Sequence, residues 1–109
     1  MSNRNLGRKY NMSNPTVSVI IPVYNAQEGI KQCLDSLLNQ SFTDFEIILL
    51  NDGSTDNSLE VIKKYAAVND FIRVIDKENE GVAKTRNKGI QLANGKYIVF
   101  IDNDDFVDS

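Results

Sequence analysis

The sequence predicts an α/β fold built on a parallel β-sheet with helices on both faces. Short apolar runs rich in β-branched residues recur along the chain, at residues 17–23, 46–51, 71–75 and 96–101. Between successive runs lies a polar turn, followed by a stretch with helical spacing of its apolar residues. Near-continuous apolar strands that alternate with helices are typical of parallel sheets buried on both faces, so the predicted order is βαβαβαβ.

The first unit begins with residues 17–23, which are short and β-branched, as expected of a buried strand. Asn25 and Glu28 have the spacing of a capping box, in which two side chains satisfy free N–H groups at the start of a helix. The apolar residues after them fall on one helical face: Ile30, Cys33, Leu34, Leu37 and Leu38. We therefore expect a strand, a capped turn and a helix that packs on the sheet.

The second unit repeats this pattern. Residues 46–51 are the second predicted strand, and Asn57 with Glu60 indicates another capped helix start. The face of the following helix carries Leu59, Ile62 and Ala66.

The third strand is expected at residues 71–75 and the third helix at residues 82–93. Asn94-Gly95 is a typical signal for the end of that helix. Residues 96–101 are the fourth strand, which we expect to be central in the sheet.

Composition excludes several kinds of site. The 109 residues are 41% hydrophobic and 25% charged, which is ordinary for one globular domain. There is no histidine, which excludes a His general base, a Ser-His-Asp triad and a His-ligated zinc site. The single cysteine, Cys33, is interpreted as a core residue and fits a reducing, cytoplasmic compartment. The positive charge is neither in excess nor clustered, which argues against a nucleic-acid-binding surface.

Residues 1–16 are polar and show no periodicity, so we expect a disordered or extended N-terminal segment. Arg4, Arg8 and Lys9 leave open a peripheral association with the cytoplasmic face of a membrane, although a solvated tail is favoured. No apolar run approaches the ~20 residues of a membrane-spanning helix, and the N-terminus shows no apolar signal region.

Polar loops follow the predicted strands, at residues 22–28, 51–56, 76–81 and 102–109. Right-handed crossovers bring the carboxyl ends of parallel strands to one edge of the sheet, and ligands bind outside that edge. The first loop lacks the Gly-x-Gly-x-x-Gly and Gly-x-x-x-x-Gly-Lys patterns, which argues against a dinucleotide fingerprint and a P-loop. A binding site of another kind is therefore expected where these loops meet.

Residues in or next to these loops suit a nucleotide. Tyr24 can stack on a flat base, or pack as an aromatic residue at the rim of the sheet. Asp52 can accept a hydrogen bond from a ribose hydroxyl or a base N–H, or can form a turn or a helix cap. Arg86 can strengthen an anion site at the start of the third helix, or form a structural pair with a carboxylate. Asp56 is interpreted as a helix cap.

The last loop is strongly acidic. The final eight residues contain Asp102, Asp104, Asp105 and Asp108, whereas residues 1–101 hold twelve basic and eleven acidic side chains. Carboxylates this close raise one another's pKa unless a cation compensates them, and hard oxygen ligands suit Mg²⁺ or Mn²⁺. An acidic, solvated tail is the alternative. A metal here would bridge phosphates and stabilise a leaving diphosphate, which predicts a transferase with a nucleoside diphosphate donor.

The loop motifs resemble those of family 2 glycosyltransferases, which have the GT-A fold. The matching segments are 19–25 (VIIPVYN), 51–56 (NDGSTD), 81–90 (GVAKTRNKGI) and 102–105 (DNDD). The resemblance runs from about residue 17 to the end of the chain. It implies that residues 17–109 are the donor-binding, Rossmann-like half of a GT-A domain, ending after the Asp-x-Asp region. The acceptor half, with the catalytic base, is expected downstream.

The resemblance also implies roles for single residues. Pro22 and Tyr24 would line the base pocket, and Asp52, with Gly53 beside it, would bind the base, commonly uracil. Arg86 would lie near the diphosphate.

Asp102, Asp104 and Asp105 match the Asp-x-Asp region of the family. Asp104 would face the ribose or a bound metal ion, either Mg²⁺ or Mn²⁺. Asp105 would be the direct ligand of this metal ion. Such enzymes transfer a sugar from a nucleotide donor, here expected to be a UDP-sugar, with inversion, to a saccharide or lipid-linked acceptor. They often act in polysaccharide or glycolipid synthesis.

A second enzyme class and a non-enzymatic role are the alternatives. A sugar-phosphate nucleotidyltransferase would need a Gly-rich, Arg-bearing loop after the first strand, which residues 22–28 do not provide. A catalytically silent domain that binds nucleotide without transfer remains the alternative. The edge of the sheet beside the fourth strand is also expected to be exposed, which predicts self-association.

Overall fold

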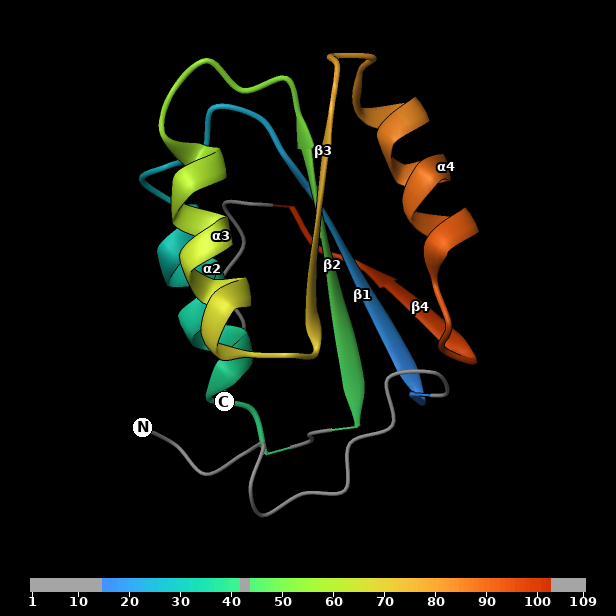
Figure 1. Cartoon of the computed structure of the whole chain (residues 1–109). Coiled ribbons are helices and arrows are strands. Elements are labelled where there is room, and N and C mark those ends of the chain that lie inside the picture. The colour runs from blue at the N-terminus through green and yellow to red at the C-terminus, as the bar shows by residue number, and fades with distance from the viewer. Residues whose placement is uncertain (1–14, 42–43, 103–109) are drawn as a thin grey trace.

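A computed structural model of the chain describes residues 15–41 and 44–102, and its elements are drawn in Figure 1. The predicted βαβαβαβ order is confirmed, and the strand bounds differ from the predicted ones by no more than two residues. The elements are β1 (Val17–Val23), α2 (Ile30–Leu38), β2 (Phe45–Asp52), α3 (Ser58–Val68), β3 (Ile72–Lys77), α4 (Val82–Leu92) and β4 (Tyr97–Phe100).

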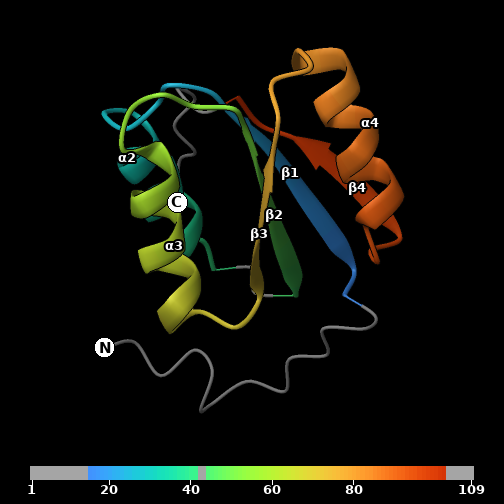
Figure 2. The same ribbon diagram turned by 45° about the horizontal axis from the view of Figure 1, so that its top comes forward.

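The strands form one parallel sheet in the order β3-β2-β1-β4. Helices α2 and α3 cover one face and α4 covers the other, as Figures 1 and 2 show, so the predicted three-layer arrangement is confirmed. The expectation that the fourth strand is central is wrong for the residues described. The chain passes over β2 and β1 through α4, so β4 pairs with β1 and lies at the edge of this sheet.

The core is divided into two layers by the sheet. The larger layer lies under α2 and α3, which bury their apolar faces against β1 and β2. Cys33 belongs to this layer and is fully buried, as predicted. The smaller layer, under α4, consists of Ile20, Ile48 and Leu50. Gly89 allows α4 to approach closely, because a Cβ there would lie 2.5 Å from Cγ2 of Ile20.

The helix starts differ from the sequence prediction. The capping box at Asn25 and Glu28 is wrong, because α2 begins after Gly29 and has no side-chain cap. Asn57 precedes α3 but its side chain makes no capping hydrogen bond either. The predicted cap at Asp56 is confirmed: Oδ1 accepts hydrogen bonds from the backbone N–H of Ser58 at 2.9 Å and from its hydroxyl at 2.6 Å. No helix among the described residues is long and apolar enough to span a membrane.

A buried carboxylate joins the strand starts to the α4–β4 turn. Glu46 is 1% exposed, and its Oε2 accepts hydrogen bonds from Ser18 Oγ and Asn94 N–H, both at 2.7 Å. Arg73 Nη1 lies 3.4 Å from Oε1 and also donates to the carbonyl of Leu92. Because an unpaired buried polar group is costly, Glu46 fixes where the chain turns into β4.

We predict that Glu46→Gln lowers the free energy of unfolding by about 2 to 3 kcal/mol, because the amide replaces an acceptor of charge-assisted hydrogen bonds. Urea unfolding measures the loss. The exposed Glu28→Gln is the matched control and should change stability by less than about 0.5 kcal/mol. Equal stability of the two variants would contradict a structural role for Glu46.

The β4 edge is apolar and exposed. Its residues, Tyr97, Ile98, Val99 and Phe100, are each between 39% and 63% exposed. We predict self-association through this edge, seen by light scattering as a mass that rises with concentration. Val99→Lys should reduce it, because a lysine on an edge strand disfavours pairing with another strand. Val68→Lys, at an exposed apolar position on α3, should not. A monomer at high concentration would rule the association out.

Candidate functional site

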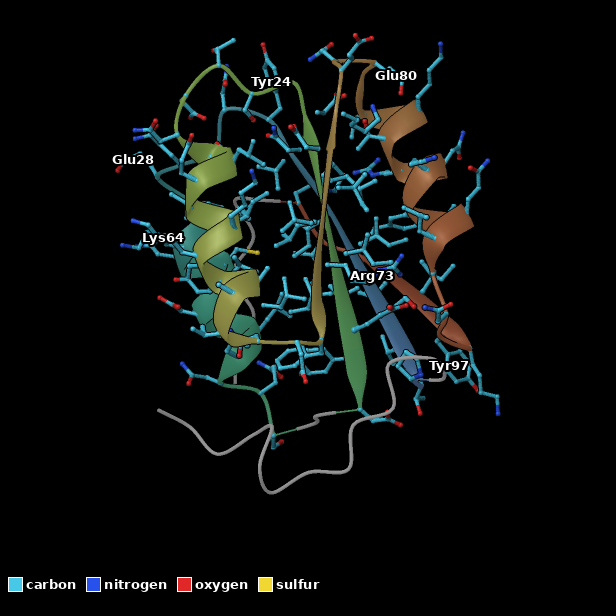
Figure 3. All side chains as sticks on the ribbon, viewed as in Figure 1. Tyr24, Glu28, Lys64, Arg73, Glu80 and Tyr97 are labelled. Carbon is cyan, nitrogen blue, oxygen red and sulfur yellow. The ribbon has the colours of Figure 1, made fainter. Side chains whose placement is uncertain are left out.

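A pocket of about 360 Å³ opens at the carboxyl edge of the sheet. Its size lies within the range of small-molecule sites, which is about 300 to 1,000 Å³. Figure 3 shows Tyr24 and Glu80 at this edge, with Tyr97 toward the opposite one. The pocket is lined by Pro22, Tyr24, Asp52, Asn79, Gly81, Val82 and Asp102. All four loops predicted to meet at this edge therefore contribute to one pocket.

Four predicted site residues lie on the pocket wall: Pro22, Tyr24, Asp52 and Asp102. Gly53 and Arg86 are not among the lining residues. Gly53 has a φ of +70°, and a Cβ there would lie 2.8 Å from both Cβ and N of Asn79, so its small size admits the neighbouring turn. Asp104 and Asp105 lie outside the described residues. Sequence reasoning selected the loop 76–81 but missed Asn79, Gly81 and Val82 as lining residues.

Tyr24 is half-exposed, which leaves its ring available on the pocket wall. The next residue, Asn25, has a φ of +47° and connects the first two loops. Its Oδ1 accepts a hydrogen bond from Thr55 N–H at 2.7 Å, and its N–H donates to Ser54 Oγ at 3.0 Å. Ala26 N–H donates to Ser58 Oγ at 2.8 Å. These bonds hold the β1–α2 loop, and with it Tyr24, against the β2–α3 loop.

Asp52 is 4% exposed and holds the turn that precedes α4. Its Oδ1 accepts from Glu80 N–H at 2.8 Å, and its Oδ2 accepts from Gly81 N–H at 3.1 Å. Asn79 Nδ2 donates to the backbone carbonyl of Asp52 at 3.0 Å. Burial alone would raise the pKa of Asp52, but hydrogen bonds from Glu80, Lys77 and Thr85 outweigh it and keep the pKa below 3.8.

Lys77, which sequence reasoning did not select, lies between two carboxylates. Its Nζ is 3.0 Å from Asp52 Oδ1 and 2.7 Å from Glu80 Oε1. Burial would lower the pKa of Lys77, but Glu80 and Asp52 together raise it above 10.5. The parallel register of β2 and β3 places Lys77 opposite Asp52. That register was the signal that could have identified it.

Arg86 and Asp102 form an ion pair, with Nη2 3.0 Å from Oδ1; Asp102 is exposed and Arg86 is partly buried. The guanidinium also lies over the ring of Phe100, 5.8 Å from its centroid, within the range of a cation–π contact. Exposed ion pairs contribute little to stability. The pair places a positive charge beside a carboxylate of the pocket wall.

The described residues include no group of three or more acidic, Cys or His side chains that could hold a metal ion. Asp102 has the hard oxygen donors that Mg²⁺ and Mn²⁺ prefer, and it lines the pocket. The other two predicted ligands, Asp104 and Asp105, lie outside the described residues.

We predict that Asp52→Asn lowers stability at neutral pH by about 2 kcal/mol, because its hydrogen bonds lose their charge. The pKa of Asp52 is lowered in the folded state, so its contribution is full above 3.8 and is lost as pH falls through the lowered value. Asp52→Asn should therefore also flatten the acid limb of the stability–pH curve, measured by urea unfolding. The exposed Asp70→Asn is the control. An unchanged acid limb would contradict the geometry.

Comparison with known proteins identifies the family. Residues 18–109 match the model of glycosyl transferase family 2. The uncharacterized glycosyltransferase YibD of Escherichia coli (strain K12) is 48% identical over 98 residues, which cover 88% of this chain and 28% of that protein. Chondroitin synthase of Pasteurella multocida (strain Pm70) is 45% identical over 94 residues, which cover 86% of this chain and 10% of the synthase.

Solved structures agree. Staphylococcus aureus TarS 1–349 is 35% identical with a TM-score of 0.79, over 85% of this chain and 28% of TarS. Its complex with UDP-GlcNAc is 33% identical with a TM-score of 0.73, over the same shares. The chain therefore spans less than a third of the relatives it matches. The predicted fold and family are confirmed, and the chain belongs to glycosyl transferase family 2.

Proposed function

We propose that this chain forms the donor site of a glycosyltransferase that uses a UDP-sugar. The observation that carries the proposal is the pocket at the carboxyl edge of the sheet, where an aromatic ring, a buried carboxylate and the start of a helix meet. Family membership supports it, as does the likeness to TarS in complex with UDP and with UDP-GlcNAc.

The base occupies the end of the pocket lined by Pro22, Tyr24 and Asp52. The half-exposed ring of Tyr24 stacks on the base, since aromatic faces bind flat bases regardless of their hydrogen-bonding pattern. The ionised carboxylate of Asp52 accepts only, so it selects a base that presents a ring N–H, as uracil does. Gly53 takes part indirectly, because its lack of a side chain lets the Asn79 turn lie against the end of β2.

The diphosphate lies toward α4. Gly81 and Val82 bring the start of this helix to the pocket, and free N–H groups at a helix start attract anions. Arg86, on the same helix, adds a guanidinium that can hold two oxygens at once.

A Mg²⁺ or Mn²⁺ ion would be held by Asp102, Asp104 and Asp105. When bound, it would offset the charge that develops on the departing diphosphate. Asp102 supports this assignment because it is exposed on the pocket wall, where donor phosphates can reach it. Arg86 lies 3.0 Å from Asp102, so its guanidinium would remain near both the carboxylate and the diphosphate.

The proposed reaction is transfer of the sugar, with inversion, to a saccharide or lipid-linked acceptor during polysaccharide or glycolipid synthesis. The names of the relatives chondroitin synthase and hyaluronan synthase support this acceptor class. We assign no catalytic base to the described residues. The alternative is a nucleotide-binding domain without transfer, and release of free or transferred sugar from the donor distinguishes the two.

We predict that UDP raises the unfolding midpoint of the protein when Mg²⁺ or Mn²⁺ is present. At 100 times its Kd, UDP should add about 2.7 kcal/mol of stability. Tyr24→Ala should remove most of this gain by taking away the stacking surface, whereas Tyr97→Ala, an exposed tyrosine on β4, should keep it. The proposal fails if no nucleoside diphosphate shifts the midpoint with either metal, or if both tyrosine variants respond like the unaltered protein.

A further inference from the structure

We propose that Lys77 is a positioning residue that sets the affinity and the base preference of the nucleotide pocket. This inference rests on the proposed function. Lys77 is not among the residues that line the pocket, so it acts on the nucleotide through residues that do.

The ammonium group of Lys77 joins three elements. Its side chain is only 11% exposed, and Nζ lies 3.0 Å from Asp52 Oδ1 at the end of β2. It also lies 2.7 Å from Glu80 Oε1 and 3.0 Å from the carbonyl of Glu78, both in the turn after β3. The fourth acceptor is Oγ1 of Thr85, a fully buried residue of α4, at 3.3 Å. An ammonium has three N–H donors, so all of them are engaged here.

Through Asp52, this ammonium is joined to the residues that form one wall of the pocket. Asp52 accepts hydrogen bonds from Glu80 N–H and Gly81 N–H, and Asn79 donates to the carbonyl of Asp52. Asp52, Asn79 and Gly81 all line the pocket. Gly81 has a φ of +93°, a conformation that other residues rarely adopt, and the hydrogen bonds from Glu80 N–H and Gly81 N–H to Asp52 hold the turn in this shape. The wall is therefore preassembled around a single cation.

Charge explains why a neutral side chain cannot replace this lysine. Asp52 and Glu80 both lie within 3.0 Å of Nζ, and without it the two carboxylates would share the turn with no counter-charge between them. Repulsion would move the turn away from Asp52 or rotate the Asp52 carboxylate. Either change misplaces the carboxylate oxygen that accepts a hydrogen bond from the base. Uracil presents a ring N–H at the position where cytosine has a bare ring nitrogen, so the misplaced acceptor weakens the binding of uracil in particular. The preference for UDP over CDP therefore depends on Lys77.

The experiment measures Kd for UDP and for CDP by calorimetry, at a temperature below the unfolding midpoint of every variant. Lys77→Met should weaken UDP binding about ten- to a hundredfold and reduce the preference for UDP over CDP. Lys77→Arg should restore most of both, because it keeps the positive charge. Lys88→Met, which removes an exposed lysine of the same region, should bind like the unaltered protein.

Glu46→Gln separates positioning from general stability. Glu46 lies at the opposite edge of the sheet, so this variant should lower the unfolding midpoint but leave both dissociation constants unchanged. If the single variant Lys77→Met does not fold, the double variant Lys77→Met/Glu80→Gln is measured instead. In the double variant, residue 80 carries no charge that could repel the Asp52 carboxylate. This double variant should still bind UDP more weakly than Glu80→Gln alone, because Asp52 Oδ1 still lacks the hydrogen bond from Lys77 Nζ that orients it.

The possible outcomes are distinct. An unaltered protein that binds no nucleoside diphosphate overturns the proposed function, and this inference with it. An unaltered protein that binds UDP, with Lys77→Met showing the same Kd and the same UDP-to-CDP ratio, overturns the inference alone. So does a double variant that binds like Glu80→Gln, and so does an affinity loss in Glu46→Gln as large as that in Lys77→Met.

Discussion

The candidate site depends on the carboxylate of Asp52, which joins the end of β2 to the turn that starts α4. Each of its oxygens accepts a backbone N–H from this turn, at 2.8 and 3.1 Å. Lys77 supplies the counter-charge that offsets the free-energy cost of burying this carboxylate. The positions of Asn79, Gly81 and Val82 depend on the hydrogen bonds of this turn to Asp52. Most of one pocket wall therefore depends on this carboxylate.

A second buried carboxylate, that of Glu46, also holds a turn next to α4, at the opposite edge of the sheet. Glu46 holds the turn between α4 and β4 through Asn94 N–H and through Ser18. The only buried residues of helix α4 are Thr85 and Gly89, neither of which has a large apolar side chain. Its position therefore depends on polar anchors at both ends, whereas α2 and α3 are held by the larger apolar core. The helix that begins at the pocket is thus placed by charge and hydrogen bonding more than by hydrophobic packing.

Much of the fold could be predicted from the sequence because the apolar runs have the length and β-branching of buried strands. The convergence of Pro22, Tyr24, Asp52 and Asp102 also followed, since parallel strands end at one edge. Strand order could not be predicted: periodicity reports burial but not neighbours, so β4 was wrongly expected to be central. The capping box predicted at Asn25 does not form, because the Asn25 side chain accepts a hydrogen bond from Thr55 N–H in the next loop. Local spacing in the sequence does not reveal this tertiary contact.

Lys77 was missed for a related reason. A lysine after a predicted strand reads as solvated surface, and only the register of β2 and β3 shows that it faces Asp52. The most direct test of the donor site is a crystal structure of the protein with UDP and Mn²⁺. We predict uracil against the ring of Tyr24 and beside Asp52, with the diphosphate toward the start of α4. UDP bound elsewhere, for example along the exposed lysines Lys84 and Lys88 of α4, would contradict it.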